Sequence, residues 1–206
     1  MGRVKHFKKA VLITGTPGVG KTTVANKLAR LLKAECIGVT ELVKTENLVA
    51  KVDDDRQTLV ADTEKVLKRI EQILDETHGL VIVEGHYAVD VVPANEVETV
   101  FVLRRDPREL EKVLQERGYK ENKVNENLSA EILDSCLWDA VSGVGSDLVC
   151  EVNVSNRTVD DIVDEILLVL NDELPRVVGM IDWLATLESE GQIEDFLKKI
   201  DLSKES

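Results

Sequence analysis

The chain has 206 residues, of which 43% are hydrophobic and 32% charged, a composition typical of one soluble globular domain with a substantial core. Its formal net charge of -13 argues against broad, sequence-independent binding of nucleic acid, which requires a basic surface. The acidity either keeps the protein soluble or attracts a basic protein partner, and composition leaves both interpretations open.

The cysteines and the apolar runs exclude further classes. Cys36, Cys136 and Cys150 are widely spaced and show no CxxC or Cys/His ligand pattern, which argues against a zinc site. An odd number of cysteines without a signal peptide predicts a cytoplasmic protein. No apolar stretch is long enough to span a bilayer, so we expect no membrane partner.

The first predicted elements surround a glycine-rich loop. Residues 10–13 form a short apolar run typical of a buried strand, and a helical apolar spacing begins at Val24. Between them the chain reads Gly15-Thr16-Pro17-Gly18-Val19-Gly20-Lys21-Thr22-Thr23, the G-x-x-x-x-G-K-T pattern of a P-loop. Because the backbone N–H groups of such a loop and of the following helix N-terminus surround phosphate oxygens, we predict that the chain binds a nucleotide such as ATP.

Individual roles within this loop follow from the chemistry of phosphate binding. Lys21 is expected to reach the terminal phosphates, and the Thr22 hydroxyl is expected to bind Mg²⁺. The remaining nucleotide-binding candidates are Gly15, Pro17, Gly18, Val19, Gly20 and Thr23.

The next segment predicts a second strand over residues 34–39 and a short helix capped by Thr40. A polar stretch then leads to Asp53-Asp54-Asp55-Arg56, which we expect to be solvated or to form a cap, because adjacent carboxylates rarely converge on a metal ion. A strongly amphipathic helix is predicted to follow. Its apolar face comprises Leu59, Thr63, Val66, Leu67, Ile70, Ile73 and Leu74.

Three further apolar runs, at residues 80–83, 99–103 and 148–153, predict strands, and a helical pattern over 159–170 follows the last of them. The alternation of strands and helices indicates an α/β fold with a parallel sheet between two helical layers. Ligands of such sheets bind at the carboxyl ends of the strands. This rim is predicted to carry the P-loop, Glu84, His86, Arg104 and Arg105.

Glu84 and His86 are the candidate catalytic residues at the end of the third strand. Glu84 is placed where a carboxylate that orients Mg²⁺ or water is expected, although an ordinary exposed acid fits the same position. Since side chains of an extended segment alternate, Glu84 and His86 can face the phosphates together. Spacing alone leaves a structural role for His86 open.

The chain after the fourth strand predicts a helix that starts at Pro107 and ends at Gly118, and then a polar insert over residues 119–127. Arg117, Lys120 and Lys123 make this region cationic, so it is either a lid that closes over phosphates or a solvated cluster. One further helix is expected to use Leu128, Ile132, Leu133 and Leu137.

Residues 175–206 carry two apolar helical patterns, one from Val177 to Leu187 and one from Ile193 to Ile200. A pair of helices docked on the main domain explains them, and so does a partner-binding element. We therefore predict a main domain over residues 1–174 and a C-terminal helical extension over 175–206.

Several of these motifs together resemble the adenylate kinase isoenzyme six family, atypical nucleotide kinases also known as small-subunit ribosome maturation factors, in an archaeal-type form. The matching segments are the P-loop, the strand Val100–Arg104, the lid sequence Arg117-Gly118-Tyr119 with Lys123, Asn127 and Glu131-Ile132, and the acidic run at Asp53. The resemblance covers roughly residues 8–170.

This resemblance implies a P-loop, adenylate kinase-like sheet in the order 2-3-1-4-5, a monophosphate-binding segment near residues 38–57 and a lid near 116–126. It also implies phosphoryl transfer from ATP to AMP with Mg²⁺, together with ATP hydrolysis. Arg117 would contact ATP, Glu84-Gly85-His86 would be the family's acid-x-His motif, and Glu84 and Thr22 would serve the metal. A small-subunit ribosomal protein would be the partner.

The sequence departs from the family in two places. Glu84 replaces the usual Asp of the acid-x-His motif, and the segment from Gly38 to Arg56 is shorter than in eukaryotic members. Three functions therefore remain open: an adenylate kinase with ATPase activity, an ATP-driven assembly switch on a ribosomal protein, and a kinase for another nucleoside monophosphate or small acceptor.

Overall fold

The computed structural model describes residues 9–53 and 58–202. Its centre is a five-stranded parallel sheet in the order β2-β5-β1-β6-β7. The strands are β1 (Ala10–Thr14), β2 (Glu35–Gly38), β5 (Val81–Glu84), β6 (Val97–Arg104) and β7 (Val149–Asn153). Numbered among themselves along the chain, these strands run 2-3-1-4-5, which confirms the predicted sheet.

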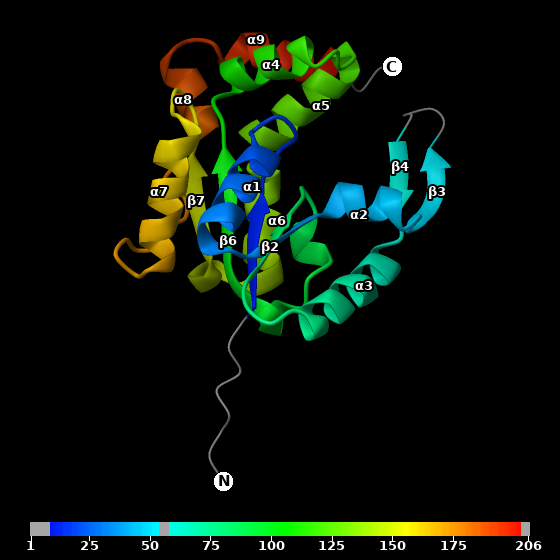
Figure 1. The fold of residues 1–206 in the computed structure, drawn as a ribbon. Coiled ribbons are helices and arrows are strands. Elements are labelled where there is room, and N and C mark those ends of the chain that lie inside the picture. The colour runs from blue at the N-terminus through cyan, green and yellow to red at the C-terminus, as the bar shows by residue number, and fades with distance from the viewer. Residues whose placement is uncertain (1–8, 54–57, 203–206) are drawn as a thin grey trace.

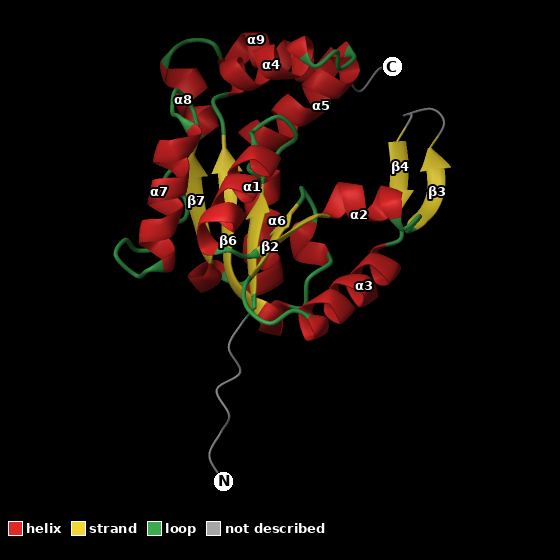
Figure 2. Cartoon of the chain, viewed as in Figure 1, coloured by secondary structure: helices red, strands yellow, loops and turns green. Residues whose placement is uncertain are grey.

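Helices cover both faces of the sheet (Figures 1 and 2). They are α1 (Lys21–Leu32), α2 (Val39–Thr45), α3 (Thr63–Glu76), α4 (Pro107–Glu116), α5 (Glu121–Ile132), α6 (Ser135–Val144), α7 (Val159–Leu170), α8 (Trp183–Ser189) and α9 (Ile193–Leu202). Short 3₁₀ turns occur at η1 (Ala88–Asp90), η2 (Ala94–Glu96) and η3 (Ser146–Leu148). Within the described ranges, none of the helices combines the length and the hydropathy needed to cross a bilayer.

The continuous apolar strands arise because both sheet faces are buried. In β1, Val11 and Ile13 pack into the core that contains α1 and α7, whereas Ala10 and Leu12 pack into the core that contains α3 and α6. All four side chains are fully buried. Complete burial of a large aliphatic side chain contributes roughly 1.5–3 kcal/mol, so packing in the two cores stabilises the position of β1 in the sheet.

The polar segment between α2 and α3 contains regular structure that the sequence analysis did not predict. It forms an antiparallel hairpin of β3 (Val49–Asp53) and β4 (Thr58–Ala61). Leu59 pairs with Val52 in this hairpin and therefore does not belong to α3. The helix instead starts after Asp62, whose side chain accepts a hydrogen bond from the N–H of Lys65 at 3.2 Å. Asp54, Asp55 and Arg56 lie outside the described residues.

The single helix predicted through Leu128 and Leu137 is also wrong, because the chain breaks at Asp134. This residue has a positive φ of 56° and its carboxylate pairs with Arg104. The break sends α5 and α6 to different cores: Leu128 packs on the α1 side and Leu137 on the α3 side. Leu133, predicted to be buried, remains 60% exposed at the turn.

The tail begins its first helix at Trp183, later than the apolar pattern from Val177 indicates. Residues before the helix are held extended, because the carbonyl of Val177 accepts a hydrogen bond from the N–H of Glu151 at 2.8 Å. Gly179 has a φ of 77°, a left-handed conformation that excludes a helix running through this residue towards Trp183. Trp183, Leu187 and Phe196 pack into the same core as α1 and α7, so α8 and α9 are docked on the sheet domain.

Candidate functional site

The P-loop connects the carboxyl end of β1 to α1 in a conformation that requires glycine. Gly15 has a φ of 133°, and a Cβ at this position would lie 2.4 Å from the carbonyl oxygen of Leu103 on β6. The loop therefore passes directly over the neighbouring strand. At its other end the carbonyl of Gly20 accepts hydrogen bonds from the N–H groups of Thr23 and Val24, both at 3.1 Å, so the helix starts within the loop sequence.

Lys21 folds back over this loop. Its ammonium group donates hydrogen bonds to the carbonyl oxygens of Gly15 at 2.7 Å and Thr16 at 3.0 Å. Burial lowers the pKa of Lys21, and the positive charge of Arg117 adds to this effect, while nearby carboxylates, including that of Glu84, oppose it. The Lys21 cation thus lies above the loop, with carboxylates and a second cation around it.

Thr22 and Glu84 meet beside Lys21. The Thr22 hydroxyl donates a hydrogen bond to Glu84 Oε1 at 3.0 Å. Glu84 ends β5, opposite Ile13 of β1 and Gly38 of β2, and a Cβ on Gly38 would lie only 3.2 Å from the same carboxylate oxygen. The longer acid therefore fits because its neighbour on β2 is a glycine.

This pair fits Mg²⁺. A hydroxyl and a carboxylate oxygen converge next to the phosphate loop, and Mg²⁺ is usually held by one or two carboxylates together with substrate phosphates. Across the described part of the chain, no three His, Cys, Asp or Glu side chains cluster as a self-contained metal site. The geometry thus suits a metal ion that arrives with the nucleotide.

His86 lies two residues beyond Glu84, in reach of the same charges. Thr14 of β1 fixes its backbone by donating a hydrogen bond to the His86 carbonyl at 3.2 Å. His86 is exposed, yet neighbouring protein atoms partly desolvate its ring, and this desolvation, with the positive charges of Lys21 and Lys123, lowers its pKa to about 4. His86 is therefore neutral at pH 7 and can accept or donate a hydrogen bond.

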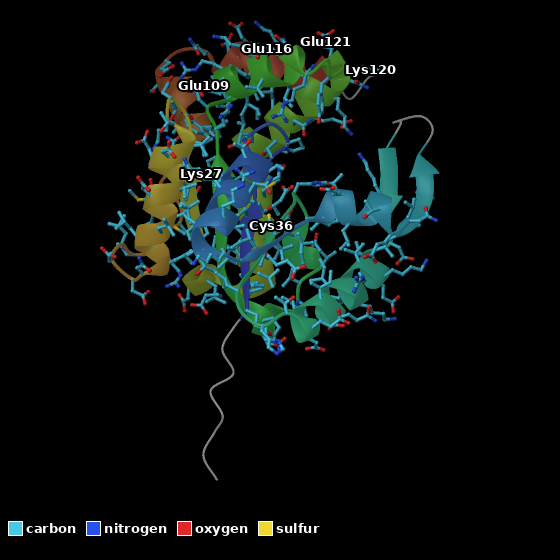
Figure 3. All side chains as sticks on the ribbon, viewed as in Figure 1. Lys27, Cys36, Glu109, Glu116, Lys120 and Glu121 are labelled. Atoms are coloured by element: carbon cyan, nitrogen blue, oxygen red, sulfur yellow. The ribbon has the colours of Figure 1, made fainter. Side chains whose placement is uncertain are left out.

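The predicted lid is a short turn between two helices. α4 ends at Glu116, α5 begins at Glu121, and Gly118 turns the chain with a φ of 74°. Figure 3 shows Glu116, Lys120 and Glu121 at the outer edge of the molecule, above the strand ends. The positive charge of Arg117 lowers the pKa of Lys21, and that of Lys123 lowers the pKa of His86, so both cations lie near the P-loop end of the sheet.

Arg104 occupies a different place from the one its sequence position predicted. Its side chain is 1% exposed and points into the protein, where it pairs with Glu131, Asp134 and Glu151. It therefore does not line the nucleotide rim. Because an unpaired arginine in a dry interior is costly, the three carboxylates hold it there.

Glu131 and Glu151 are buried acids beside the site to which the sequence analysis assigned no role, although Glu131 was among the residues that resemble the family's lid. Glu131 Oε2 accepts a hydrogen bond from the Thr16 hydroxyl of the P-loop at 2.5 Å. A signal was present in the sequence, since Glu151 interrupts the apolar run of β7 and Glu131 follows the apolar spacing of α5. Charges at core positions usually indicate paired, buried groups.

Cys136, at the start of α6, also lies beside the loop. Burial raises the pKa of its thiol, although the charge of Lys21 and a hydrogen bond with Thr16 act in the opposite direction. The thiol is therefore protonated and unreactive at neutral pH.

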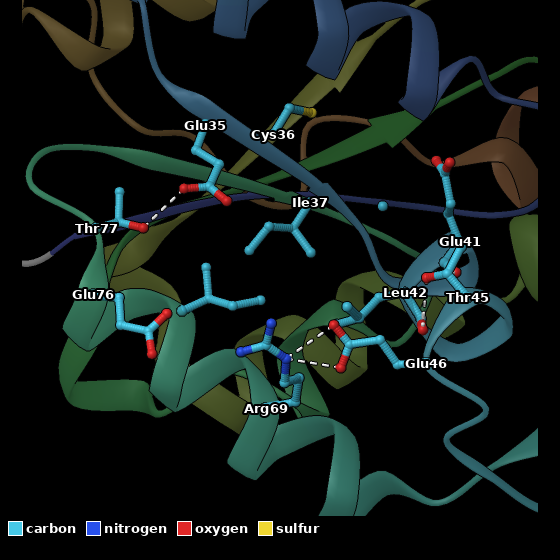
Figure 4. Close-up of a pocket in the computed structure, with 12 residues that line it drawn as sticks. Glu35, Cys36, Ile37, Glu41, Leu42, Thr45, Glu46, Arg69, Glu76 and Thr77 are labelled. Carbon is cyan, nitrogen blue, oxygen red and sulfur yellow. Dashed lines mark hydrogen bonds and ion pairs between the residues drawn. The ribbon is translucent and has the colours of Figure 1, made fainter.

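A separate groove runs along the outer edge of β2, between α2 and α3 (Figure 4). Its volume is about 680 Å³. Four glutamates line it, Glu35, Glu41, Glu46 and Glu76, against one arginine, Arg69. Arg69 is already paired with Glu46 at 2.8 Å, which leaves the groove acidic.

Comparison with known proteins adds to this geometry. A family profile described as an AAA domain matches residues 11–134. The protein named "Putative adenylate kinase" of Methanocaldococcus jannaschii is 39% identical over 173 residues, which cover 84% of this chain and 92% of the relative. A protein of the same name from Pyrococcus furiosus is 35% identical over 186 residues, covering 86% and 93%. The chain belongs to this adenylate kinase family.

Solved structures agree with the family at the level of the fold. Shikimate kinase from Bacteroides thetaiotaomicron superposes with a TM-score of 0.56 at 15% identity, over 79% of this chain and 98% of that one. Shikimate kinase from Acinetobacter baumannii in complex with shikimate gives the same TM-score at 16% identity, covering 82% and 96%. The chain thus has the P-loop kinase fold.

Proposed function

We propose that the chain transfers a phosphoryl group from ATP to AMP and also hydrolyses ATP, as a cytoplasmic enzyme. The observation that carries the proposal is the contact of Thr22 with Glu84 beside Lys21 on the P-loop. A cation and a metal-orienting carboxylate are what phosphoryl transfer requires, because its catalysis consists mainly of positioning and charge stabilisation. The names of the relatives support the same reaction.

Each residue has a role in this proposal. Lys21 binds the terminal phosphates, and the backbone of residues 15–23 surrounds them. Thr22 and Glu84 hold Mg²⁺, which when bound would neutralise charge on the phosphate oxygens. Arg117 closes over ATP from the lid turn, and neutral His86 orients the attacking water during hydrolysis.

A coupled assay tests the transfer. ADP formation is measured with ATP alone and with ATP plus AMP, with Lys21→Ala as the inactive control. We expect AMP to raise the rate clearly. An identical rate with and without AMP would refute the adenylate kinase activity. Glu84→Gln and His86→Ala are expected to lower hydrolysis more than ATP binding, whereas equal losses would indicate a structural role for these side chains.

The identity of the acceptor is the next question. A thermal-shift panel of nucleoside monophosphates, each with an ATP analogue, ranks candidates by stabilisation of the folded state. A ligand at about 100 times its Kd raises the free energy of unfolding by roughly 2.7 kcal/mol. If another monophosphate or small acceptor raises the unfolding temperature more than AMP does, the reaction is still phosphoryl transfer from ATP but the acceptor is that compound.

We also propose a role in maturation of the small ribosomal subunit through a ribosomal protein. The acidic groove along β2 and the net charge of -13 favour a basic partner. The test is co-purification with basic small-subunit ribosomal proteins in the presence and absence of ATP. Binding that is lost when Glu35 and Glu76 are changed to lysine would support this role, and unchanged binding would exclude the groove.

A further inference from the structure

The carboxylate of Glu131 lies at the centre of a buried hydrogen-bond network. Its Oε2 accepts from the Thr16 hydroxyl at 2.5 Å. Its Oε1 accepts from Arg104 Nε at 3.0 Å, from the N–H of Arg105 at 3.0 Å and from the indole N–H of Trp183 at 3.1 Å. Glu131 is 2% exposed, so these four donors replace water around the charge.

The donors come from distant parts of the chain. Thr16 belongs to the P-loop, Arg104 ends β6, and Trp183 begins α8 in the C-terminal segment. Trp183 itself is 6% exposed. Hydrogen bonds to a charged group are strong, and their loss is costly in a dry interior. When one donor to a buried carboxylate is removed, the carboxylate and its remaining donors are therefore expected to shift.

The carboxylate of Glu151 also links the C-terminal segment to Arg104 through hydrogen bonds. Glu151 Oε1 accepts from Arg104 at 2.7 Å, while its Oε2 accepts from the N–H groups of Gly179 at 2.5 Å and Met180 at 3.1 Å. Arg104 thus joins two acids that both hold residues 179–183. The C-terminal segment is therefore fastened by the interior that also supports the P-loop.

Thr16 contacts both this network and the Lys21 side chain of the nucleotide site. Its hydroxyl donates to Glu131, whereas its carbonyl accepts from the Lys21 ammonium at 3.0 Å. An incoming phosphate attracts the ammonium and competes with the carbonyls of the loop for it. Binding of a nucleotide therefore changes the electrostatics at the residue that Glu131 holds.

We propose that Glu131 is a positioning residue that couples docking of the C-terminal segment at Trp183 to the conformation of the P-loop at Thr16. The proposal rests on the proposed nucleotide binding at that loop. Because coupling between two sites is reciprocal, contacts at Trp183 strengthen nucleotide binding, and a bound nucleotide changes the environment of Trp183. The C-terminal segment is then part of the nucleotide-binding unit.

Tryptophan fluorescence provides a direct test. The chain has two tryptophans, and Trp138 is 67% exposed on α6, so Trp138→Phe leaves Trp183 as the only tryptophan emitter. In this background we titrate Mg·ADP, follow Trp183 emission, and measure the Kd by calorimetry. Thr16→Val removes the hydroxyl, and Thr16→Ser is the matched control that keeps it. Trp183→Phe, made in the unmodified chain, removes only the indole donor at the other end.

We expect Mg·ADP to shift Trp183 emission when Thr16 is present and after Thr16→Ser, but not after Thr16→Val. Loss of one hydrogen bond to the carboxylate should weaken ADP binding about tenfold for Thr16→Val and about threefold for Trp183→Phe. Combining the two changes should weaken binding less than the product of the single effects, because both act through one carboxylate.

An unchanged emission shift after Thr16→Val would overturn the coupling, and so would an ADP affinity of Trp183→Phe equal to that of the unmodified chain. Absence of ADP binding by the unmodified chain would overturn both the coupling and nucleotide binding. A normal Trp183 response without phosphoryl transfer to AMP would refute the proposed kinase activity alone and support the coupling.

Discussion

The absence of a side chain at Gly38 leaves room for the Glu84 carboxylate to accept the hydrogen bond from Thr22 of the P-loop. The backbone of Gly38 is extended, with a φ of -84° and a ψ of 110°, so alanine is allowed there without strain. Its Cβ, however, would stand 3.2 Å from Glu84 Oε1 and displace that oxygen by a few tenths of an ångström. The hydrogen bond from Thr22, now 3.0 Å long, would lengthen to the limit of a useful contact.

The expected magnitude follows from this contact. Hydrogen bonds to charged groups contribute about 1.5–3 kcal/mol, so partial loss in Gly38→Ala should reduce turnover roughly fivefold to tenfold. Folding stability should remain equal or rise by about 0.4–1 kcal/mol, since alanine lowers the entropy of the unfolded chain. Activity and stability are thus expected to change in opposite directions.

A double-mutant cycle tests the cause. The carboxylate of Glu84→Asp is retracted by one methylene and avoids the new Cβ, so Gly38→Ala should cost nothing further in that background. Initial rates of ADP formation from ATP, with and without AMP, are measured for the four proteins, along with ADP affinity. If Gly38→Ala lowers the rate by the same factor beside Glu84 and beside the aspartate, the contact with Glu84 is not the cause.

Three further outcomes are expected. Lys21→Ala should abolish turnover and leave the midpoint of thermal unfolding nearly unchanged; full turnover would show that the loop does not serve phosphates. His86 has a folded-state pKa of about 4, below the unfolded value of 6.5, so the unfolded state binds more protons between these values and stability should fall as pH drops from 6.5 towards 4. Solvent screening keeps this loss small, and thermal unfolding of His86→Gln should show a weaker pH dependence than the unmodified chain. Arg104→Met leaves Glu131 and Glu151 buried without their cation and should lower the free energy of unfolding by about 3–5 kcal/mol in urea titrations, whereas a loss below about 1 kcal/mol would mean that the acids are otherwise satisfied.

Much of the candidate site followed from local sequence. The P-loop needs a fixed glycine and lysine spacing between a strand and a helix, and Glu84 follows a continuous apolar strand. Such features depend on neighbours in the chain, so periodicity and motif spacing predict them. The order of the sheet was predicted through the resemblance to a known family, since hydrophobic periodicity does not rank strands.

The hairpin was not predicted from its polar sequence. The break at Asp134 and the late start of α8 were not predicted because each depends on a partner far away in sequence. Asp134 can adopt a positive φ where Arg104 holds its carboxylate, and the extended stretch before Trp183 is held by Glu151. Hydrophobic periodicity predicts which face of a segment is buried, but it does not predict which distant charged side chain will contact that segment in the fold.

The sequence by itself therefore determined the phosphate loop, the alternation of strands and helices and the carboxylate at the end of β5. Only the tertiary structure decided that Arg104 turns inward, that Gly38 makes room for Glu84, and that Glu131 joins Thr16 to Trp183. The physical reason is that phosphate recognition uses backbone groups close together in the chain, whereas a buried charge must be neutralised by whichever distant side chains the fold brings to it.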